Sequence, residues 1–332
     1  MLPDSNRRCT YYLQKNFEYV LKIIIYLDII IAVKKIIETE ISAMTYTLKN
    51  NILTVEIDSL GAQILSVKKD GCEYIWQGNP EFWAGRTPLL FPICGRLFEG
   101  RYFYEGKEYQ MNLHGFVRAL ELNVVSATDT EISFSLCQNE QTLAMYPFDF
   151  EFVVSYTLDG DKISSRVDIK NTGDKVLPAT FGAHPGFNVP LDGGNFEDYY
   201  LEFSEDCTPN KLIFSETCFN TGKKKAMELI DGNKLPLRHS LFDVDAIFMD
   251  RIAPAVTLKS DKSQRSVTVK YADMPYLGIW HKPRTSAPYV CIEPWCGLPS
   301  FDGQVDDMST KCDMFHIPAG KCKSISYEII FK

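Results

Sequence analysis

Strict alternation of apolar and polar side chains constrains this chain more than any other feature. Between residues 148 and 158 an apolar side chain falls at every second position, and after an Asp159-Gly160 turn signal the alternation resumes over 163–169. Successive side chains of a β-strand point to opposite faces, so this pattern predicts a hairpin with one buried face. Shorter stretches with the same period occur at 53–57, 132–136, 267–269 and 325–329.

Helical periodicity is missing from the same part of the chain. After about residue 44, no apolar repeat of 3.6 residues runs for the length of a helix, and turn signals such as 171–173 separate the strand-like runs. No linker, charge block or internal repeat marks a domain boundary. Many strands joined by short turns predict an all-β fold, a large antiparallel β-sandwich that forms one domain over residues 44–332.

The first 43 residues have a different composition. An Ile-rich stretch over 19–37 follows a basic start, and charged residues interrupt it, among them Asp28. No uncharged run reaches the roughly 18–20 residues that span a bilayer. We predict that residues 1–43 are an N-terminal extension, either an appended helix or a mis-assigned start. A membrane-directed segment is the alternative that we consider less favoured.

Charge and cysteine content exclude several classes of protein. The 332 residues include 35 Lys and Arg against 43 Asp and Glu, a net charge of −8, without a basic cluster, which argues against a nucleic-acid partner. Ten cysteines are scattered without a C-x-x-C pair, and Cys291 and Cys296 are too far apart for a zinc knuckle. We expect reduced, mostly buried thiols in a cytoplasmic protein.

Three stretches break the strand pattern with Gly, Pro, aromatic and ionisable residues. The first is 83–97 with its continuation 112–118, the second is 181–188, and the third is 291–299. Each places a titratable group among rigid, apolar neighbours, where desolvation and hydrogen bonding shift its pKa. These stretches are the candidate functional segments.

The ionisable groups of these segments could together form a sugar site. His114 and His184 can exchange protons near neutral pH, and we expect burial between Ile292 and Pro294 to raise the pKa of Glu293. Arg96 and Arg118 offer planar guanidinium groups, which bind hydroxyl or phosphate oxygens. Trp295 offers an aromatic face, which packs on the C–H surface of a sugar.

Each of these residues could also have an ordinary structural role. A His before Gly or Pro is often a hydrogen-bonded turn residue, a Glu before Pro often ends a strand, and arginines are common surface charges. We interpret the remaining histidines, His239, His281 and His316, as structural. Composition and periodicity alone predict a β-sandwich with a polar cleft.

Seven short segments, taken in their order along the chain, support a family resemblance that no single segment would support. The sequence resembles the aldose 1-epimerase (galactose mutarotase-like) family, and within it the LacX-like branch. The matching segments, which run from about residue 44 to the end of the chain, are Leu89–Arg96, Leu113–Arg118, Tyr146–Phe150, Gly182–Phe187, Leu241–Ala246, Tyr276–Trp280 and Cys291–Gly297.

This resemblance implies a galactose mutarotase-like sandwich and an isomerase that interconverts the α and β anomers of a hexose through the open-chain aldehyde. It implies Glu293 as the base for the C1 hydroxyl and His184 as the acid for the ring oxygen. It also implies that Arg96 and His114 hold the ring oxygen and neighbouring hydroxyls. No metal or organic cofactor is expected, because only protons are transferred.

The remaining residues of the implied site concern substrate recognition. Asp245 would accept hydrogen bonds from sugar hydroxyls, with Asp243 as the alternative, and Arg118 is typical of this branch and of hexose-6-phosphate epimerases. Trp295 stands where mutarotases proper have Gln. Leu97-Phe98 and Ser300 also depart from the family pattern, so the resemblance does not fix galactose as the substrate.

Three other functions stay open at this point. A hexose-6-phosphate 1-epimerase would use the arginines, whereas a non-catalytic carbohydrate-binding or sensor protein would need no acid–base pair. A glycosidase or lyase is disfavoured, because glycosidases usually place two carboxylates around the bond. We expect the partner to be a small-molecule sugar or sugar phosphate, and the protein to be a monomer or homodimer.

Overall fold

The computed structural model describes residues 44–332, of which Thr45–Lys332 form one compact unit. The extension predicted for residues 1–43, with its appended helix or mis-assigned start, lies outside the described residues. Within the described part, no helix combines the length and the apolar character needed to cross a membrane.

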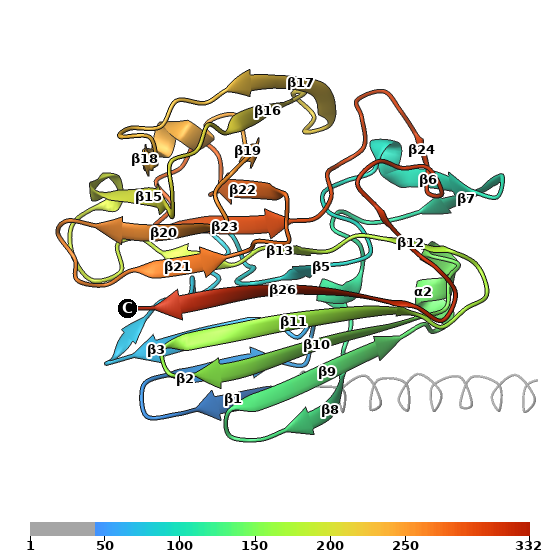
Figure 1. Cartoon of the computed structure of the whole chain (residues 1–332), viewed down its shortest axis with the longest axis horizontal. Helices are drawn as coiled ribbons and strands as arrows, with labels where there is room; N and C mark the ends of the chain where they lie inside the picture. The colour runs from blue at the N-terminus through green and yellow to red at the C-terminus, as the bar shows by residue number, and fades with distance from the viewer. Residues whose placement is uncertain (1–43) are drawn as a thin grey trace, which may run out of the picture. The chain divides into compact units, whose positions relative to one another are not determined.

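The largest sheet contains the hairpin that the sequence predicts. Its nine strands run in the order β18 (Lys234–Pro236), β15 (Tyr199–Phe203), β20 (Ala255–Ser260), β21 (Val267–Lys270), β26 (Cys322–Phe331), β11 (Lys162–Asn171), β10 (Phe150–Asp159), β9 (Glu131–Cys137) and β8 (Asn123–Ala127). Buried and less buried positions alternate along β10 and β11, which confirms the predicted hairpin. Figure 1 shows β26, β11, β10 and β9 side by side.

A second large sheet carries the three segments that break the strand pattern. Its order is β17 (Asn220–Ala226), β16 (Asn210–Phe214), β19 (Ile247–Asp250), β22 (Tyr276–Trp280), β23 (Tyr289–Trp295), β13 (Gly182–Ala183) and β5 (Leu89–Leu90), and β14 (Gly186–Asn188) also pairs with β23. Every strand pair in the two large sheets is antiparallel, as predicted.

Smaller elements complete the described part. A four-stranded sheet joins β1 (Thr45–Lys49), β2 (Thr54–Asp58), β3 (Ile64–Lys69) and β4 (Cys72–Glu73). A three-stranded sheet joins β24 (Asp306–Asp307), β6 (Arg101–Tyr104) and β7 (Lys107–Gln110), with β24 and β6 parallel, and β12 (Leu177–Ala179) pairs with β25 (Phe315–Ile317).

The fold is mostly β rather than wholly β. Residues 44–332 contain one short α-helix, α2 (Glu140–Met145), which is capped by Asn139, whose side chain accepts a hydrogen bond from the Thr142 N–H at 2.9 Å. Six residues are too few for a recognisable helical period, which explains why the sequence did not predict this helix. Single 3₁₀ turns occur at Phe98–Gly100, Val117–Ala119, Phe196–Asp198 and His239–Phe242.

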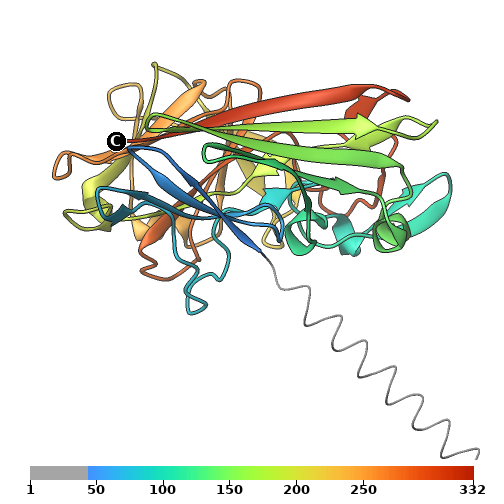
Figure 2. The same cartoon turned by 90° about the horizontal axis from the view of Figure 1, so that it is seen from below.

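Aromatic side chains join the two large sheets. The ring of Phe91, next to β5, lies 5.2 Å from the ring of Phe150 and 4.9 Å from that of Phe152, both on β10. Next to β13, Phe181 contacts Tyr327 of β26 at 6.4 Å. All five side chains are buried, so the sheets share a core. In Figure 2 the long strands β26, β11 and β10, drawn in red and green, lie along one side of the unit.

Candidate active site

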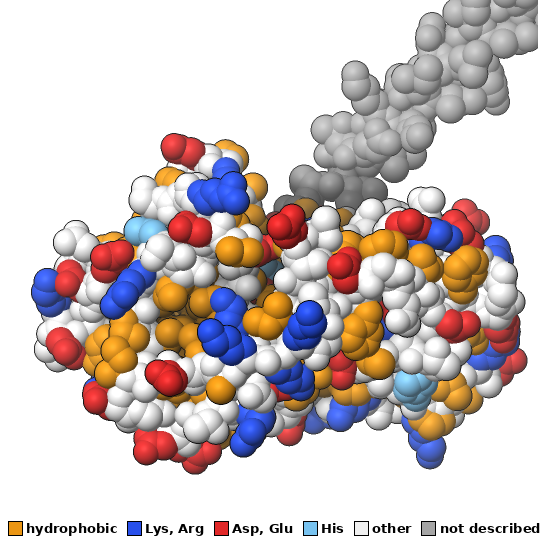
Figure 3. Space-filling model, turned by 90° about the horizontal axis from the view of Figure 1, so that it is seen from above, with side chains coloured by type: hydrophobic (Ala, Val, Ile, Leu, Met, Phe, Trp, Pro, Cys, Tyr) orange, Lys and Arg blue, Asp and Glu red, His pale blue; other side chains and the backbone are white. Residues whose placement is uncertain are grey.

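A cavity of about 480 Å³ opens beside β23 and is the centre of the candidate site. Its volume is within the range of roughly 300–1,000 Å³ that is usual for small-molecule sites. All seven residues predicted from the sequence line it: Arg96, His114, Arg118, His184, Asp245, Glu293 and Trp295. Figure 3 shows a hollow in which hydrophobic side chains gather, bordered by Lys or Arg side chains.

The alternation of β23 explains how Glu293 reaches this cavity. Val290 and Ile292 point into the shared core, whereas Cys291, Glu293 and Trp295 lie on the opposite face. Both faces of the strand are covered, and every one of its residues is buried. Glu293 is therefore a carboxyl group in a strand that is otherwise apolar, with only 2% of its surface exposed.

His184 comes to the same place from the short connection between β13 and β14. Both of these strands pair with β23, Gly182 opposite Trp295 and Gly186 opposite Cys291, so the two residues between them, His184 and Pro185, lie opposite the middle of β23. The Ile292 N–H donates to the carbonyl of Pro185 at 3.1 Å and fixes this connection. As a result, His184 Nε2 lies 3.2 Å from Glu293 Oε2.

Burial controls the protonation of this pair. Desolvation lowers the pKa of His184 to about 3, and desolvation followed by the charge of Asp245 raises the pKa of Glu293 well above its usual value. Both shifts favour a neutral carboxylic acid beside a neutral imidazole. A carboxylate beside an imidazolium has the same total charge, so one proton crossing the 3.2 Å gap converts one state into the other.

Three buried polar atoms around the pair have no hydrogen-bond partner among the described residues. They are His184 Nδ1, Glu293 Oε1 and Trp295 Nε1. Buried polar groups are nearly always paired in proteins, and an unpaired one calls for an explanation such as a catalytic role or a bound water or ion. Donors and acceptors of this kind suit the hydroxyl groups of a sugar.

Two tryptophans that were not predicted as site residues hold the imidazole in place. Trp83 stacks on the ring of His184 at 4.9 Å, and Trp280 meets that ring edge-on at 5.7 Å. Trp83 opens the first candidate segment and Trp280 ends one of the matching motifs, so the signal was present in the sequence. Nothing in one sequence said which segment would cover which side chain.

Asp245, rather than the alternative Asp243, lies in the cavity wall. Its two oxygens accept hydrogen bonds from Trp280 Nε1 at 2.9 Å and from the Cys218 thiol at 2.7 Å. Asp243 lines a separate surface hollow, where its backbone carbonyl accepts a hydrogen bond from Arg284. Cys218 was not predicted from the sequence.

His114 is neutral and its tautomer is set by the backbone. Its Nδ1 accepts a hydrogen bond from the Gly95 N–H at 3.0 Å, which leaves the ring proton on Nε2. Desolvation, and then the neighbouring charges of His184, Arg118 and Arg96, hold its pKa well below the usual value. His114 can therefore donate a hydrogen bond at neutral pH without carrying a charge.

The two arginine side chains of the cavity donate hydrogen bonds to backbone carbonyls rather than to carboxylates. Arg96 donates to the carbonyl of Thr217 at 3.3 Å and Arg118 to that of Leu113 at 3.1 Å. Within the described part of the chain, neither guanidinium forms an ion pair with a carboxylate. Lys211, which the sequence did not single out, adds a third cation to the lining. The cavity could therefore hold oxygen-rich or anionic groups.

The other predicted positions lie outside the cavity. Ser300, a departure from the family pattern, is buried and hydrogen-bonds to the Asp306 carboxylate. His239 and His281 contact each other at 3.1 Å, and His316 bonds to the Ser309 carbonyl, all away from the site.

The burial of the cysteines differs from the prediction of mostly buried thiols. None of the nine described cysteines forms a disulfide. Cys94, Cys291 and Cys296 are buried, but the other six are exposed or only half-buried, so the expectation of mostly buried thiols is wrong. Cys137 ends β9 and Cys322 begins β26, and both side chains are exposed.

Comparison with solved structures identifies the fold. A solved structure of a galactose mutarotase related enzyme from Lactobacillus acidophilus has a TM-score of 0.83 and 34% identity, covering 87% of this chain and 97% of the other. A galactose mutarotase-like protein from Lactobacillus casei ATCC 334 has a TM-score of 0.82 and 30% identity, covering 87% and 100%. The predicted galactose mutarotase-like fold is confirmed.

Sequence comparison leads to the same group of proteins. The chain is 40% identical over 266 residues to the plasmid form of protein LacX of Lactococcus lactis subsp. lactis, which covers 77% of this chain and 88% of LacX. The family model described as Aldose 1-epimerase matches residues 44–301. On this evidence the chain belongs to the aldose 1-epimerase family.

Proposed function

We propose that the protein is an aldose 1-epimerase that interconverts the α and β anomers of a free hexose or a close relative. The observation that carries this proposal is the buried His184–Glu293 pair, 3.2 Å apart in the wall of a cavity of sugar-site size. Family membership supports the same reaction class.

The proposed reaction moves two protons and no other group. The Glu293 carboxylate takes the proton of the C1 hydroxyl while the His184 imidazolium protonates the ring oxygen, and the C1–O5 bond breaks to give the aldehyde. After rotation about C1–C2, His184 takes the proton of the C5 hydroxyl and Glu293 returns one to the aldehyde oxygen. Each acid–base group contributes roughly 10²–10⁴-fold.

The environment of the pair suits this cycle. Ring opening converts the charged pair into the neutral pair, which is the state that burial favours. Ring closure regenerates the charged pair, so neither group needs an external proton between turnovers. Arg96 and His114 donate to the ring oxygen and nearby hydroxyls, Asp245 accepts from hydroxyls, and Trp295 offers an aromatic face.

The acid–base assignment is tested by E293Q and H184N. Each variant should lose anomer exchange by at least about 10²-fold, while sugar binding falls only modestly, because each replaces one proton-transfer group by a neutral isostere. Polarimetry or NMR of freshly dissolved sugars measures the exchange, and calorimetry the binding. E228Q and H316N are matched controls outside the cavity. Wild-type exchange in E293Q or H184N would overturn the assignment.

A hexose-6-phosphate 1-epimerase is the second candidate. Arg96, Arg118 and Lys211 line the cavity, and neither arginine is neutralised by a carboxylate among the described residues. Turnover of paired substrates with and without the 6-phosphate separates the candidates. A preference for the phosphate that disappears in R118Q would favour the second one.

A non-catalytic sugar-binding protein is less well supported. Binding alone needs neither a buried carboxyl group nor an imidazole in contact with it, and burying such a pair costs stability. A cytoplasmic location and a monomeric or homodimeric state stay predictions from the sequence.

A further inference from the structure

A third potential metal ligand lies beside the proposed acid–base pair. Cys291 is two residues before Glu293, so both side chains project from the same face of β23. A ligand atom from each of His184, Cys291 and Glu293 lies within 4.8 Å of the other two, and all three residues are buried. The proposed reaction gives the Cys291 thiol no role.

The three groups match the preferences of one cation. Thiolate, imidazole and carboxylate are the usual protein ligands of Zn²⁺, with bonds of roughly 2.0–2.3 Å. Tetrahedral coordination at such bond lengths separates ligand atoms by roughly 3.3–3.8 Å. His184 Nε2 and Glu293 Oε2 are 3.2 Å apart, so only small movements would bring the pair and the Cys291 sulfur around one ion.

We propose that His184, Cys291 and Glu293 form a Zn²⁺-binding site through which zinc reversibly inhibits the protein. Three protein ligands leave the fourth position to water from the cavity. The bound ion would hold Nε2 of His184 and a carboxylate oxygen of Glu293, the atoms that transfer protons in the proposed function. The inhibitory consequence rests on that function, whereas the binding site itself does not.

The surroundings favour a reversible site over a permanent one. Metal-bound histidines normally donate their other ring N–H to a carboxylate or carbonyl, and losing that partner costs 10–100-fold in affinity. His184 Nδ1 has no such partner among the described residues. The sequence did not predict this site, because its ligands come from two distant segments rather than from a C-x-x-C motif.

Cobalt absorption tests the ligands directly. Co²⁺ bound to a thiolate gives a near-ultraviolet charge-transfer band, and Zn²⁺ should displace it. The starting protein is the EDTA-treated full chain with Cys9, Cys137, Cys312 and Cys322 replaced by serine. We expect this protein and C218S to give the band, and C291S to lose it. C218S is the matched control, because Cys218 is the thiol in the cavity wall.

Three results of the cobalt experiment would contradict the proposed site. A band that survives in C291S, disappears in C218S, or is absent from the starting protein would overturn the proposal. H184N, which removes a second ligand and keeps the buried thiol, should weaken Co²⁺ binding at least ten-fold. C291A replaces C291S if the serine variant does not fold, which circular dichroism establishes.

An activity measurement tests the consequence separately. Zn²⁺ should stop anomer exchange, EDTA should restore it, and C291S should need at least ten-fold more zinc for half inhibition. Equal zinc sensitivity of C291S and its parent would overturn the inhibition. If the protein has no epimerase activity, the cobalt spectra still decide the metal site, so the two proposals can fail independently.

Discussion

At the scale of single residues, burial decides the charge of every histidine around the site. His184 and His114 both lose the charged form because desolvation lowers their pKa values. The reaction proposed for His184 nevertheless needs an imidazolium for one step. A carboxyl group in direct contact provides it, because proton transfer from Glu293 creates both charges together and each stabilises the other.

His281 gives a prediction about stability and pH. It is fully buried, and burial, the largest cause, lowers its pKa to about 4. The unfolded chain, with a histidine pKa near 6.5, therefore binds a proton between pH 6.5 and 4 that the folded protein does not bind. Stability should fall as the pH falls through this window, by about 3 kcal/mol for this residue.

The variant H281Q isolates this contribution. It lacks the titrating ring, so its free energy of unfolding should decrease by about 3 kcal/mol less than that of the wild type between pH 7 and pH 4. Urea denaturation at fixed pH values measures both proteins. Parallel pH profiles of the two proteins would contradict the prediction.

The sequence pointed to the two residues that we propose as proton carriers, but not to the residues that position them. Glu293 and His184 stood out because an ionisable group among apolar neighbours is unusual. Trp83 and Trp280 lie in segments that the sequence singled out, and Cys218 does not, but the role of all three comes from what they contact: Asp245 and the ring of His184. Such contacts between distant segments cannot be read from a single sequence without an alignment.

At the scale of elements, the turn that carries His114 depends on the glycine after it. Gly115 has a φ of +72°, and a Cβ atom there would lie 2.1 Å from the carbonyl oxygen of Phe91. The N–H of Phe116 donates to that same oxygen at 3.0 Å. Only glycine allows the turn to approach this backbone so closely.

The variant G115A should therefore destabilise the protein and displace His114 from the site. Its matched control is G106A, which has a similar φ of +75° but open space around the added Cβ. The control should cost roughly 1–2 kcal/mol for the left-handed conformation alone, and G115A about 2 kcal/mol or more beyond that. Urea unfolding measures the difference; equal costs would show that the close approach does not matter.

Long strands were easier to predict from the sequence than short ones. Period-two alternation located β2, β9, β10, β11, β21 and β26, because each buries one face. Short strands such as β5 and β13 escaped, since two residues carry no period. The short strands β13 and β14 bring the His184 connection to β23, so the least predictable elements position the candidate site.

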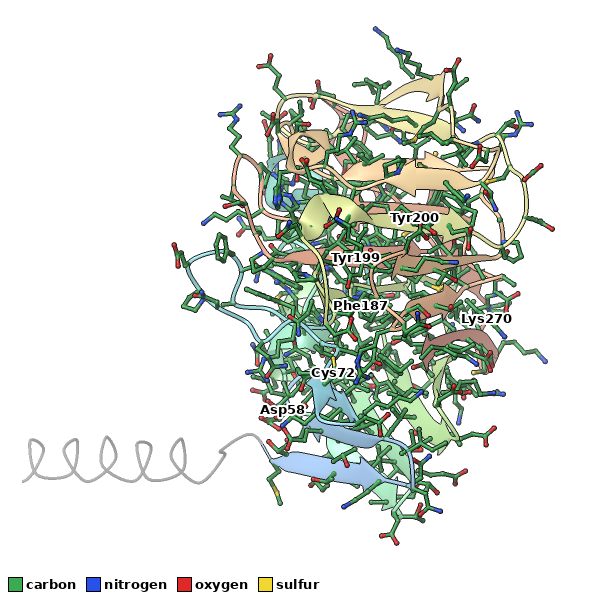
Figure 4. The ribbon with its side chains drawn as sticks, turned by 90° about the vertical axis from the view of Figure 1, so that its left-hand side faces the viewer. Asp58, Cys72, Phe187, Tyr199, Tyr200 and Lys270 are labelled. Carbon is green, nitrogen blue, oxygen red and sulfur yellow. The ribbon has the colours of Figure 1, made fainter. Side chains whose placement is uncertain are left out.

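At the scale of the whole molecule, the two large sheets have different tasks. The nine-stranded sheet supplies long strands and aromatic rings to the core, and the eight-stranded sheet carries the cavity. Figure 4 shows the division between inside and outside, with Phe187 in the interior and the Lys270 side chain pointing outward. The sequence predicted the sandwich from alternation, but not which face of which sheet would hold the site.

Phe152 tests whether the shared core, rather than the site, holds the sheets together. It is fully buried on β10, and its ring contacts Phe91 and Phe181 beside the other sheet at 4.9 and 6.4 Å. F152A should lower the free energy of unfolding by about 3–5 kcal/mol, because it removes these contacts and leaves a cavity. V125A, at an exposed position on edge strand β8, should change it by less than about 0.5 kcal/mol.

The same variant separates stability from function. Phe152 does not line the cavity, so F152A should keep near wild-type anomer exchange per folded molecule at low temperature while its urea midpoint falls. F152L, which fills more of the space, should lie between the wild type and F152A in stability. If exchange per folded molecule fell in proportion to stability across this series, the site would depend on the far sheet, and the division of tasks between the two sheets would be wrong.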